Sequence, residues 1–532
     1  MHPSVHAAAQ PDKPAVIMTG SGESWSYAEL DRRSNRIAQL LRDRGLGIGD
    51  TVAFCLDNRL EVFAFVWGAQ RAGLVYVAIS NRLTAGEIAY IVEDSGARLL
   101  LAGPLAEDVL AGVAAALPDL DRFIVGGISE SWRDWDSAAA AMPELPIADE
   151  RAGVDMLYSS GTTGRPKGIR HPLPEDPAIA QLDRLTMLAA GAFGFSGEAV
   201  YLSPAPLYHA APLRWCVSVH RLGGTVVVME RFDPAAALAA IECWRVTHSQ
   251  WVPTHFVRML KLPEAERLRH DVSSLVCAVH AAAPCPVPVK AAMIDWWGPV
   301  LREYYAGTEG MGLTFITSEE WVARPGSVGR AILGTLHICD EEGAELPPGE
   351  TGIVYFGDGP AFQYHGDRAK TAEATHPLGW TTLGDVGHVD ADGYLWLTDR
   401  KSFMIISGGV NIYPQEIENL LVTHPAVADA AVIGAPHEEM GEEVVAVVQP
   451  LDPAAAGPEL AAEIGAWLRA RLAGLKVPRR IDFRAALPRL PTGKLQKGLL
   501  RDEYRLLAES AGCGGSAADA SAAAIDPARA GA

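Results

Sequence analysis

The stretch MLYSSGTTGRPKGI (156–169) gathers small residues, hydroxyl groups and one Lys directly after the strand-like segment VDMLY. Gly residues let backbone N–H groups turn inward around an anion, and Ser and Thr hydroxyls add donors. The stretch does not match the Walker pattern, because Pro166 stands where that pattern needs Gly and Gly168 follows Lys167. It predicts a phosphate-binding loop of another kind, and the alternative is a solvated turn. The candidate donors are Ser159, Ser160, Gly161, Thr162, Thr163, Gly164 and Lys167.

The segments on both sides of this loop alternate short apolar runs with amphipathic helical patterns. Such alternation predicts an α/β domain with a largely parallel sheet. The predicted strands are 51–56, 74–79, 97–103, 199–206, 223–229, 247–253 and 274–281, and the predicted helices are 27–44 and 61–72.

From about residue 331 onward, Asp, Gly and Pro turns separate short alternating runs, which favours an antiparallel, β-rich subdomain. A hairpin is expected over 389–397. The pattern therefore predicts a large N-terminal domain of residues 1–400 and a small α+β C-terminal domain of residues 401–508 that contains a βαβ-like unit. Residues 509–532 are rich in Ala, Gly and Ser and are expected to be a disordered tail.

Composition limits the class of protein. A chain of 532 residues is too long for one core, so several domains are expected. The net charge of −20 argues against a nucleic-acid partner or an anionic membrane surface. Seven Cys without a CxxC pair predict reduced thiols in a cytoplasmic protein. We expect no signal peptide and no membrane span, because no apolar run approaches the ~20 residues of a membrane helix.

The segment YYAGTEG (304–310) has the chemistry of a nucleotide site. The ring of Tyr305 can stack on adenine, and the hydroxyl of Thr308 can donate to a phosphate oxygen. The carboxylate of Glu309 can hold Mg²⁺ as a hard oxygen ligand, and its alternative role is a helix cap.

Two later segments also carry candidate residues. In GWTTLGDVG (379–387), the carboxylate of Asp385 can accept hydrogen bonds from two ribose hydroxyls, and the alternative is a turn-forming Asp. In DRKSFMIISGGVNIYPQEIE (399–418), the adjacent Gly408 and Gly409 suit a tight turn or a place where a ligand passes the backbone closely.

Three more segments complete the set. LPRLPTGKLQK (487–497) presents Lys494 on an exposed loop. PLYHAAPLRW (206–215) holds His209, whose alternative role is that of a satisfied core residue. The segment HAAAPCPVP (280–288) is rich in small residues.

In this order, the segments resemble those of the AMP-forming acyl-CoA synthetases, within the superfamily that also contains peptide-synthetase adenylation domains and luciferases. The resemblance extends from about residue 11 to residue 504 and is greatest to bacterial fatty-acid and steroid-side-chain CoA ligases. It implies a large N-terminal domain and a small, mobile C-terminal one. The chain departs from the family pattern at Ala306, where Gly is usual, and at Ser402 and Phe403, where charged residues are common.

The resemblance implies specific roles. Arg400 would contact ribose and phosphate, Ser402 would be the hinge, and Gly408 and Gly409 would belong to the thioester-forming loop. Lys494 would reach the acyl carboxylate and the α-phosphate during adenylation.

Further residues follow from the same alignment of motifs. His209 would be a gate between the acyl pocket and the CoA tunnel. The implied catalytic residues are Lys494, Glu309, His209 and Gly409. The implied nucleotide-binding residues, besides those of the loop, are Tyr305, Ala306, Gly307, Thr308, Asp385, Arg400 and Gly408. The implied substrate-pocket residues are His209, Ala281, Ala282, Ala283, Gly307 and Gly310, and the implied metal ligands are Glu309 and Thr163.

The implied reaction converts a carboxylic acid, ATP and CoA into an acyl-CoA, AMP and pyrophosphate, with Mg²⁺ as the metal ion. Small pocket residues favour a long-chain or polycyclic acid. Several alternatives stay open: loading of a carrier protein, catalysis of only one half-reaction, luciferase-like oxidation, and a nucleotide sensor without turnover. A homodimer is also left open.

Overall fold

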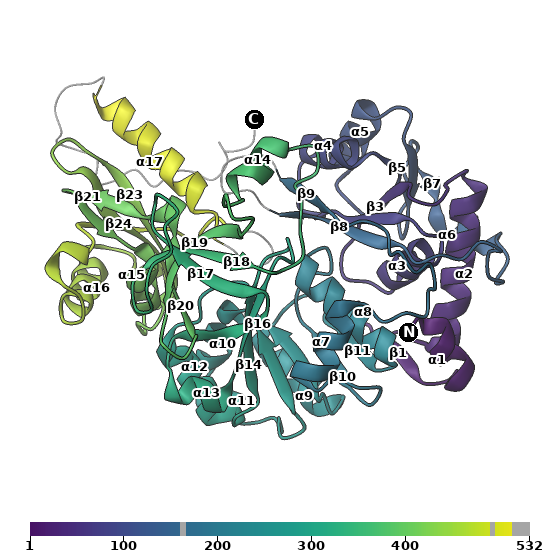
Figure 1. Ribbon diagram of the computed structural model, residues 1–532, viewed down its shortest axis with the longest axis horizontal. Helices are drawn as coiled ribbons and strands as arrows, with labels where there is room; N and C mark the ends of the chain where they lie inside the picture. The colour runs from purple at the N-terminus through teal and green to yellow at the C-terminus, as the bar shows by residue number, and fades with distance from the viewer. Residues whose placement is uncertain (160–165, 490–494, 513–532) are drawn as a thin grey trace. The chain divides into compact units, whose positions relative to one another are not determined.

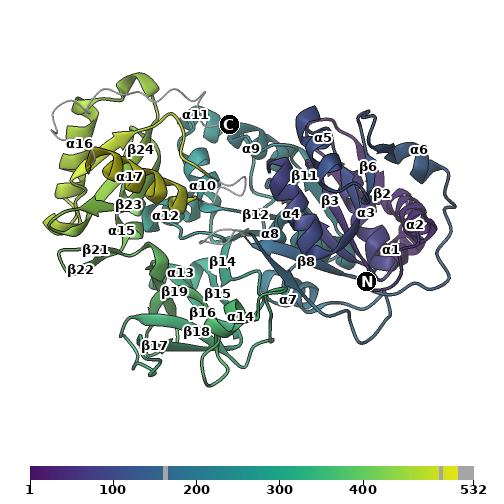
Figure 2. The ribbon, with the colours of Figure 1, turned by 90° about the horizontal axis from the view of Figure 1, so that it is seen from above.

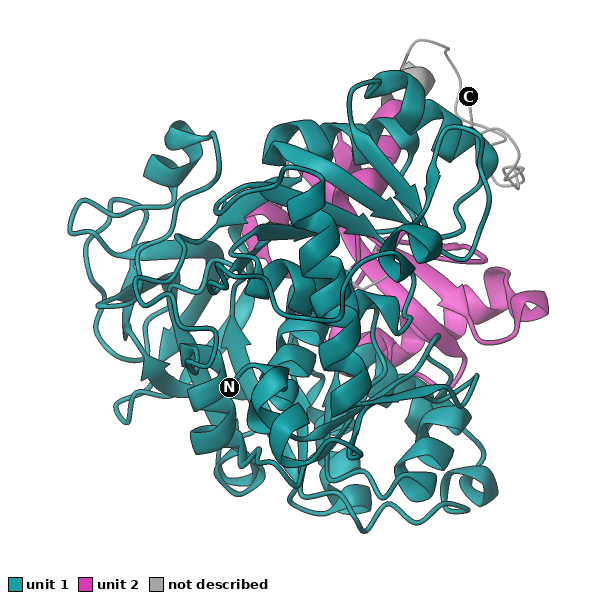
Figure 3. Cartoon of the chain, turned by 90° about the vertical axis from the view of Figure 1, so that its right-hand side faces the viewer, with its two compact units in different colours: residues 1–401, 490–494 teal, residues 402–489, 495–532 magenta. Residues whose placement is uncertain are grey.

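The computed structural model describes residues 1–159, 166–489 and 495–512. The chain divides into two compact units, with the boundary between Lys401 and Ser402 (Figure 3). Unit 1 contains Met1–Lys401, and the described part of unit 2 consists of Ser402–Arg489 and the residues from Leu495 onward. No helix among the described residues is long and apolar enough to cross a membrane.

Unit 1 contains a sheet that the structure describes as seven-stranded, in the order β7-β6-β5-β3-β4-β8-β9 (Figure 1). All neighbouring strands are parallel except β8 and β9. The strands are β3 (Thr51–Cys55), β4 (Val75–Ala78), β5 (Ala97–Ala102), β6 (Asp121–Ile124), β7 (Arg133–Asp134), β8 (Val154–Ser159) and β9 (Lys167–Arg170). The helices of this part are α2 (Tyr27–Asp43), α3 (Glu61–Arg71), α4 (Ala85–Ser95), α5 (Glu107–Ala116) and α6 (Trp135–Ala140).

Both faces of this sheet are covered, which explains why its central strands β3 and β4 are buried along their whole length rather than at alternate residues. Phe54 of β3 belongs to the core that includes α2 and α3, whereas its neighbours Ala53 and Cys55 pack in the core that includes α4 and α5. Figure 2 shows β3 between these two pairs of helices. The predicted helices 27–44 and 61–72 are thus confirmed as α2 and α3, each with a boundary one residue shorter.

The other sheet of unit 1 is 13-stranded in the part of the chain that the structure describes. Its order is β17-β18-β19-β20-β16-β15-β14-β13-β12-β10-β11-β1-β2. The part from β14 to β1 is parallel, and the part from β14 to β17 is antiparallel. The strands are β1 (Pro14–Met18), β2 (Ser24–Ser26), β10 (Val200–Ser203), β11 (Thr225–Val228), β12 (His248–Trp251), β13 (Cys277–His280), β14 (Leu301–Ala306), β15 (Leu313–Thr317), β16 (Ser327–Leu333), β17 (Thr335–Cys339), β18 (Gly352–Gly357), β19 (Thr381–Val389) and β20 (Leu395–Arg400).

The remaining helices of unit 1 connect or flank these strands. They are α1 (Pro3–Ala9), α7 (Arg184–Phe193), α8 (Ala210–Leu222), α9 (Pro234–Cys243), α10 (Pro253–Leu260), α11 (Glu264–Arg267), α12 (Val287–Trp297), α13 (Ser318–Ala323) and α14 (Arg368–Glu373). The hairpin predicted over 389–397 is confirmed, because Val389 of β19 pairs with Leu395 of β20.

Unit 2 is a smaller α+β body around the long antiparallel pair of β23 and β24. Its strands are β21 (Ile405–Ser407), β22 (Val410–Ile412), β23 (Val427–His437), β24 (Gly441–Pro450) and β25 (Arg480–Phe483). Its helices are α15 (Pro414–Leu421), α16 (Pro458–Arg469) and α17 (Lys497–Gly512), and short 3₁₀ turns occur at Lys401–Phe403, Pro453–Ala455 and Gly474–Lys476.

The predicted βαβ-like unit needs a partial correction. The two predicted strands and the helix after them are β23, β24 and α16, and the β24–α16–β25 crossover is completed by β25, a strand that the sequence pattern did not mark. β23 and β24 are antiparallel instead, because the few residues between them make a turn, whereas a parallel pair needs a long crossover. The predicted fold class is confirmed: a large N-terminal α/β domain with a β-rich part, and a separate α+β C-terminal domain.

Candidate active site

The quoted stretch connects two antiparallel strands. Ser159, the last residue of β8, pairs with Lys167, the first residue of β9. β8 is parallel to β4, so the stretch follows the carboxyl end of a parallel strand, where α/β proteins commonly bind ligands. The candidate donors Ser160, Gly161, Thr162, Thr163 and Gly164 lie outside the described residues.

Residues from two motifs converge on Tyr364. The Tyr364 hydroxyl donates to Glu309 Oε1 at 2.9 Å, and Lys167 Nζ lies 5.1 Å from the centroid of the Tyr364 ring. The backbone explains this placement, because Tyr364 forms a bridge with Ile169 of β9 and the next N–H, that of His365, donates to Gly168 O at 2.8 Å. Glu309 itself is buried.

The charge states of this group follow from its surroundings. Burial and the Glu309 carboxylate raise the pKa of Tyr364, so its hydroxyl keeps its proton and remains a donor. Burial lowers the pKa of Lys167, and the nearby Lys370 lowers it further. Sequence reasoning missed Tyr364, because the surrounding GPAFQYHGD has no motif that marks it.

Replacing Tyr364 with Phe keeps the ring near Lys167 but removes the hydrogen bond to Glu309. The resemblance implies that Glu309 holds Mg²⁺ during adenylation. A hydrogen bond to a charged group contributes about 1.5–3 kcal/mol, so on that assignment we expect roughly a tenfold or larger loss of adenylation at limiting Mg²⁺. The measurement is acyl-adenylate formation as a function of Mg²⁺ concentration, with Tyr355→Phe on β18 as the control. Equal Mg²⁺ dependence in Tyr364→Phe and the unchanged protein would contradict this assignment.

Three predicted nucleotide-binding residues form a second cluster. The Tyr305 hydroxyl donates to Asp385 Oδ2 at 2.6 Å, and Arg400 Nε donates to Asp385 Oδ1 at 3.1 Å. Register places Asp385 and Arg400 opposite each other on β19 and β20. The Tyr305 ring stacks on Phe356, with centroids 6.1 Å apart. Burial and the Asp385 carboxylate raise the pKa of Tyr305, so this phenol is also a neutral donor.

His209 lies at the N-cap of α8, with its ring 4.5 Å from that of Tyr208. Burial lowers the pKa of His209 to about 3, so the imidazole is neutral at pH 7. Within the described residues, His209 Nε2 has no hydrogen-bond partner. The neutral ring carries no charge that would oppose a change of position, which is compatible with the gate role that the resemblance implies.

Arg214, on α8, links two of the motifs. Its Nε donates to Asp155 Oδ2 at 2.6 Å, and its Nη1 donates to Thr308 O at 3.4 Å. Asp155 precedes the quoted loop on β8, and Thr308 belongs to YYAGTEG. Sequence reasoning quoted the segment that contains Arg214 but did not single out this residue, although a charged residue in an apolar helix was a signal.

The predicted pocket segment directly follows β13. Ala281 is buried, whereas Ala282 and Ala283 are exposed. Ala282 has φ of 76°, a conformation that Ala rarely adopts, and such strain is commonly found at functional sites.

The two predicted pocket glycines lie in one turn after β14. A Cβ at Gly307 would lie 2.5 Å from Glu309 Oε2, so a larger residue there would displace the Glu309 side chain. Gly310 has φ of 71°, and its N–H donates to Gly307 O at 3.1 Å. Ala306 is the last residue of β14.

In unit 2, Gly408 and Gly409 are the central residues of the hairpin between β21 and β22, where Ser407 pairs with Val410. Their φ angles are 56° and 79°, as in a type I′ turn. Around a Cβ built at Gly409, no heavy atom of the described chain lies within 4 Å, whereas one at Gly408 would meet Met440 Cε at 2.5 Å. Ser402 is the first residue of unit 2, and Lys494 lies outside the described residues.

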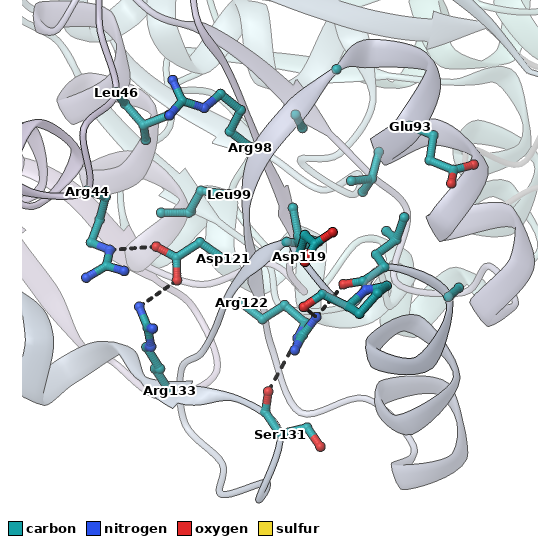
Figure 4. A pocket seen from close by; sticks show the side chains of 17 residues that line it. Arg44, Leu46, Glu93, Arg98, Leu99, Asp119, Asp121, Arg122, Ser131 and Arg133 are labelled. Atoms are coloured by element: carbon teal, nitrogen blue, oxygen red, sulfur yellow. Dashed lines mark hydrogen bonds and ion pairs between the residues drawn. The ribbon is translucent and has the colours of Figure 1, made fainter.

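A separate cavity of about 790 Å³ lies at the amino ends of β5 and β6 (Figure 4). Arg44 Nε and Arg133 Nη1 donate to the two oxygens of Asp121, at 2.6 and 2.7 Å. None of the predicted site residues lines this cavity, and its arginines are already paired.

Comparisons with known proteins agree with these motifs. The family described as AMP-binding enzyme matches residues 4–362, and the AMP-binding enzyme C-terminal domain matches residues 416–494. A feruloyl-CoA synthase from Amycolatopsis sp. is 35% identical over 92% of this chain and 96% of its own length. The fatty acid–[acyl-carrier-protein] ligase ScoC of Streptomyces coeruleorubidus is 32% identical over 94% of this chain and 95% of its own.

Among solved structures, the anthranilate CoA ligase AuaEII in complex with anthranoyl-AMP matches with a TM-score of 0.82 and 25% identity. The match covers 96% of this chain and 98% of that one. The fold and the site therefore define an adenylate-forming enzyme. The chain belongs to the AMP-binding enzyme family, and the resemblance to AMP-forming acyl-CoA synthetases is confirmed. The roles of the individual residues stay predictions.

Proposed function

We propose that this chain is an ATP-dependent acyl-CoA ligase that activates a carboxylic acid as an acyl-adenylate and passes the acyl group to CoA. The observation that carries the proposal is the convergence of distant motifs within unit 1. Tyr305, Asp385 and Arg400 form a cluster suited to a nucleoside, and Glu309 and Lys167 share Tyr364 as a neighbour.

In the first step, a carboxylate oxygen of the acid attacks the α-phosphorus of ATP. The bond from this phosphorus to the bridging oxygen breaks, and pyrophosphate leaves. Charge develops on the phosphate oxygens, so preorganised donors lower the barrier. The proposed donors are the ammonium of Lys494 and the hydroxyls of Thr162 and Thr163. Arg400 and Asp385 would hold the ribose in place.

Glu309 fits the proposed role as a Mg²⁺ ligand. Proteins usually hold Mg²⁺ through one or two carboxylates together with substrate phosphates. No group of three or more His, Cys, Asp or Glu within the described residues could hold a metal ion. In this proposal the ligands of the ion are Glu309, the hydroxyl of Thr163 and the ATP phosphates. When bound, the ion would neutralise part of the phosphate charge.

In the second step, the small domain would rotate about the hinge, so that one pocket serves both reactions. The thiol sulfur attacks the acyl carbon, the bond to AMP breaks, and the thiol proton passes to solvent. Gly409 supports this proposal, because no heavy atom of the described chain lies within 4 Å of the position that a Cβ would take there.

The acid that we propose is long-chain or polycyclic, supported by the small residues of the pocket segment. An aromatic acid is a second candidate, favoured by the feruloyl-CoA synthase relative. A carrier protein is a second candidate acceptor, favoured by the match to ScoC. A cytoplasmic location is part of the proposal, since the six described cysteines are free thiols.

The test measures ATP–pyrophosphate exchange and thioester formation separately. The panel is a long-chain fatty acid, a steroid acid and ferulic acid, each with CoA or with an acyl carrier protein. We expect exchange with at least one acid and thioester formation with CoA. Exchange without any thioester would show an enzyme of the first half-reaction alone, and no exchange with any acid would overturn the proposed activity.

Removing the hydroxyls of Thr162 and Thr163 together should raise the KM for ATP or slow adenylation. Each lost hydrogen bond to a charged group should cost about 1.5–3 kcal/mol. The measurement is the ATP dependence of acyl-adenylate formation in the double Ala variant. A double Ser variant, which keeps both hydroxyls, is the control. Unchanged ATP kinetics in the double Ala variant would show that these hydroxyls do not bind the ATP phosphates.

A further inference from the structure

One face of α17 contacts the segment that begins unit 2. Lys497 and Arg501 are four positions apart, so both lie on the same side of this helix. Lys497 Nζ lies 2.9 Å from Glu418 Oε1 and 5.1 Å from the centroid of the Phe403 ring. Arg501 Nη1 donates to Ser402 O at 2.7 Å. Arg501 thus contacts Ser402, and Lys497 contacts the next residue, Phe403.

The other end of this segment is held from β24. Glu442 Oε2 accepts a hydrogen bond from the Ile406 N–H at 2.9 Å, and Glu442 Oε1 lies 3.5 Å from Arg501 Nη2. Arg501 and Glu442 therefore form a clamp, with Ser402 O bound to one side chain and Ile406 N to the other. The clamp fixes residues 402–406 to the body of unit 2.

The residues before the boundary are held within unit 1. Arg400 contacts Asp385 on β19, and Lys401 Nζ lies 3.4 Å from Glu341 Oε1. Residues up to Lys401 are therefore bound to unit 1, and residues from Ser402 onward are bound to unit 2. The backbone bonds between Lys401 and Ser402 join the two units.

We propose that Arg501 is a positioning residue that confines the rotation of the small domain to the Lys401–Ser402 joint. The inference rests on the proposed function, because it assumes that the domain rotates between two half-reactions. A segment held at both ends cannot share the change of backbone angles, so the joint must absorb all of it.

Arg501 suits a mechanical role better than a role in stability. Its side chain is 38% exposed and its ion pair with Glu442 is long, and exposed pairs contribute about 0–1 kcal/mol. The pair of Lys497 and Glu418 is different, because both side chains are buried. Removing Arg501 should therefore loosen the segment without unfolding unit 2.

Ser402→Pro alone should trap one orientation, because Pro fixes φ near −65° at the joint. We expect one half-reaction to fail and the other to survive. The assays are acyl-adenylate formation from acid and ATP, and thioester formation from supplied acyl-adenylate. Normal rates in both assays would show that the rotation does not use this joint.

The decisive measurement adds Arg501→Ala to Ser402→Pro. With the clamp removed, residues 403–406 can take up part of the rotation, so the loss of rate caused by Ser402→Pro should shrink by about threefold to fivefold, as expected for removal of a contact worth up to about 1 kcal/mol. Arg505→Ala is the matched control, because Arg505 lies on the same helix and, among the described residues, pairs with Asp502 at 3.0 Å, one turn away. Adding Arg505→Ala to Ser402→Pro should leave the loss of rate caused by Ser402→Pro unchanged. If Ser402→Pro lowers the rate equally with and without the Arg501 side chain, the proposal is overturned.

Hydrogen exchange supplies a readout that needs no substrate. Arg501→Ala should speed exchange of the backbone amides of residues 402–406, whereas Arg505→Ala should not. If the unchanged protein forms no acyl-adenylate, the proposed function fails but this measurement still tests the clamp. Unchanged exchange in Arg501→Ala would show that Arg501 does not hold the segment.

Discussion

Replacing Lys494 with Ala should nearly abolish acyl-adenylate formation, while conversion of a supplied acyl-adenylate to acyl-CoA continues. The ammonium would balance the charge that builds on the α-phosphate and the attacking carboxylate. Losing one preorganised donor of this kind typically costs about 10²–10³ in rate. The second step would use the rotated domain, in which this loop faces away from the pocket. Paired assays on the same preparation, one for each step, measure the difference.

Lys476→Ala is a matched control in the small domain. Lys476 is a partly exposed lysine that pairs with Glu416 at 2.6 Å, so its loss removes a charge without touching the proposed chemistry. Equal losses in both steps for Lys494→Ala would refute its specific role in adenylation. An unchanged protein that fails the first assay and passes the second would identify an enzyme of thioester formation alone.

The fold was predictable where burial alone decides the structure. The runs that became β3 and β4 are buried along their whole length, and β5 is buried except at Arg98, because helices cover both sheet faces. Strand direction was harder to predict. The apolar sequences of β23 and β24 are compatible with parallel and with antiparallel pairing. The short turn between the two strands decides in favour of the antiparallel pair.

The site was predictable where a motif concentrates its chemistry in a few consecutive residues, as for Glu309. Contacts between distant segments were not predictable. Tyr364 meets Glu309 across 55 positions, and Arg214 reaches Thr308 across 94. No local motif marks Tyr364, and the local signal at Arg214 is a charged residue in a mostly apolar helix, which does not identify its partner. Strand register and helix packing bring these side chains together.

Gly409→Leu should have the opposite effect to Lys494→Ala. Within the described chain the space around Gly409 is open, so a new side chain would project into the proposed path of the thiol. Even a misplacement of about 1 Å can cost 10²-fold, so we expect a loss of that order in thioester formation from supplied acyl-adenylate. Acyl-adenylate formation from acid and ATP should remain, because that step uses the other face of the small domain.

Backbone strain must be separated from steric block, because Gly409 has φ of 79° and Leu resists this conformation. Gly393→Leu is the matched control. Gly393 has φ of 82°, its Cβ position is equally open within the described chain, and it lies in the turn between β19 and β20. This variant carries the same strain at a hairpin without a proposed role in thioester formation. If Gly393→Leu loses thioester formation as severely as Gly409→Leu, strain alone accounts for the loss. If only Gly409→Leu does, and adenylation survives, the two steps use opposite faces of the small domain.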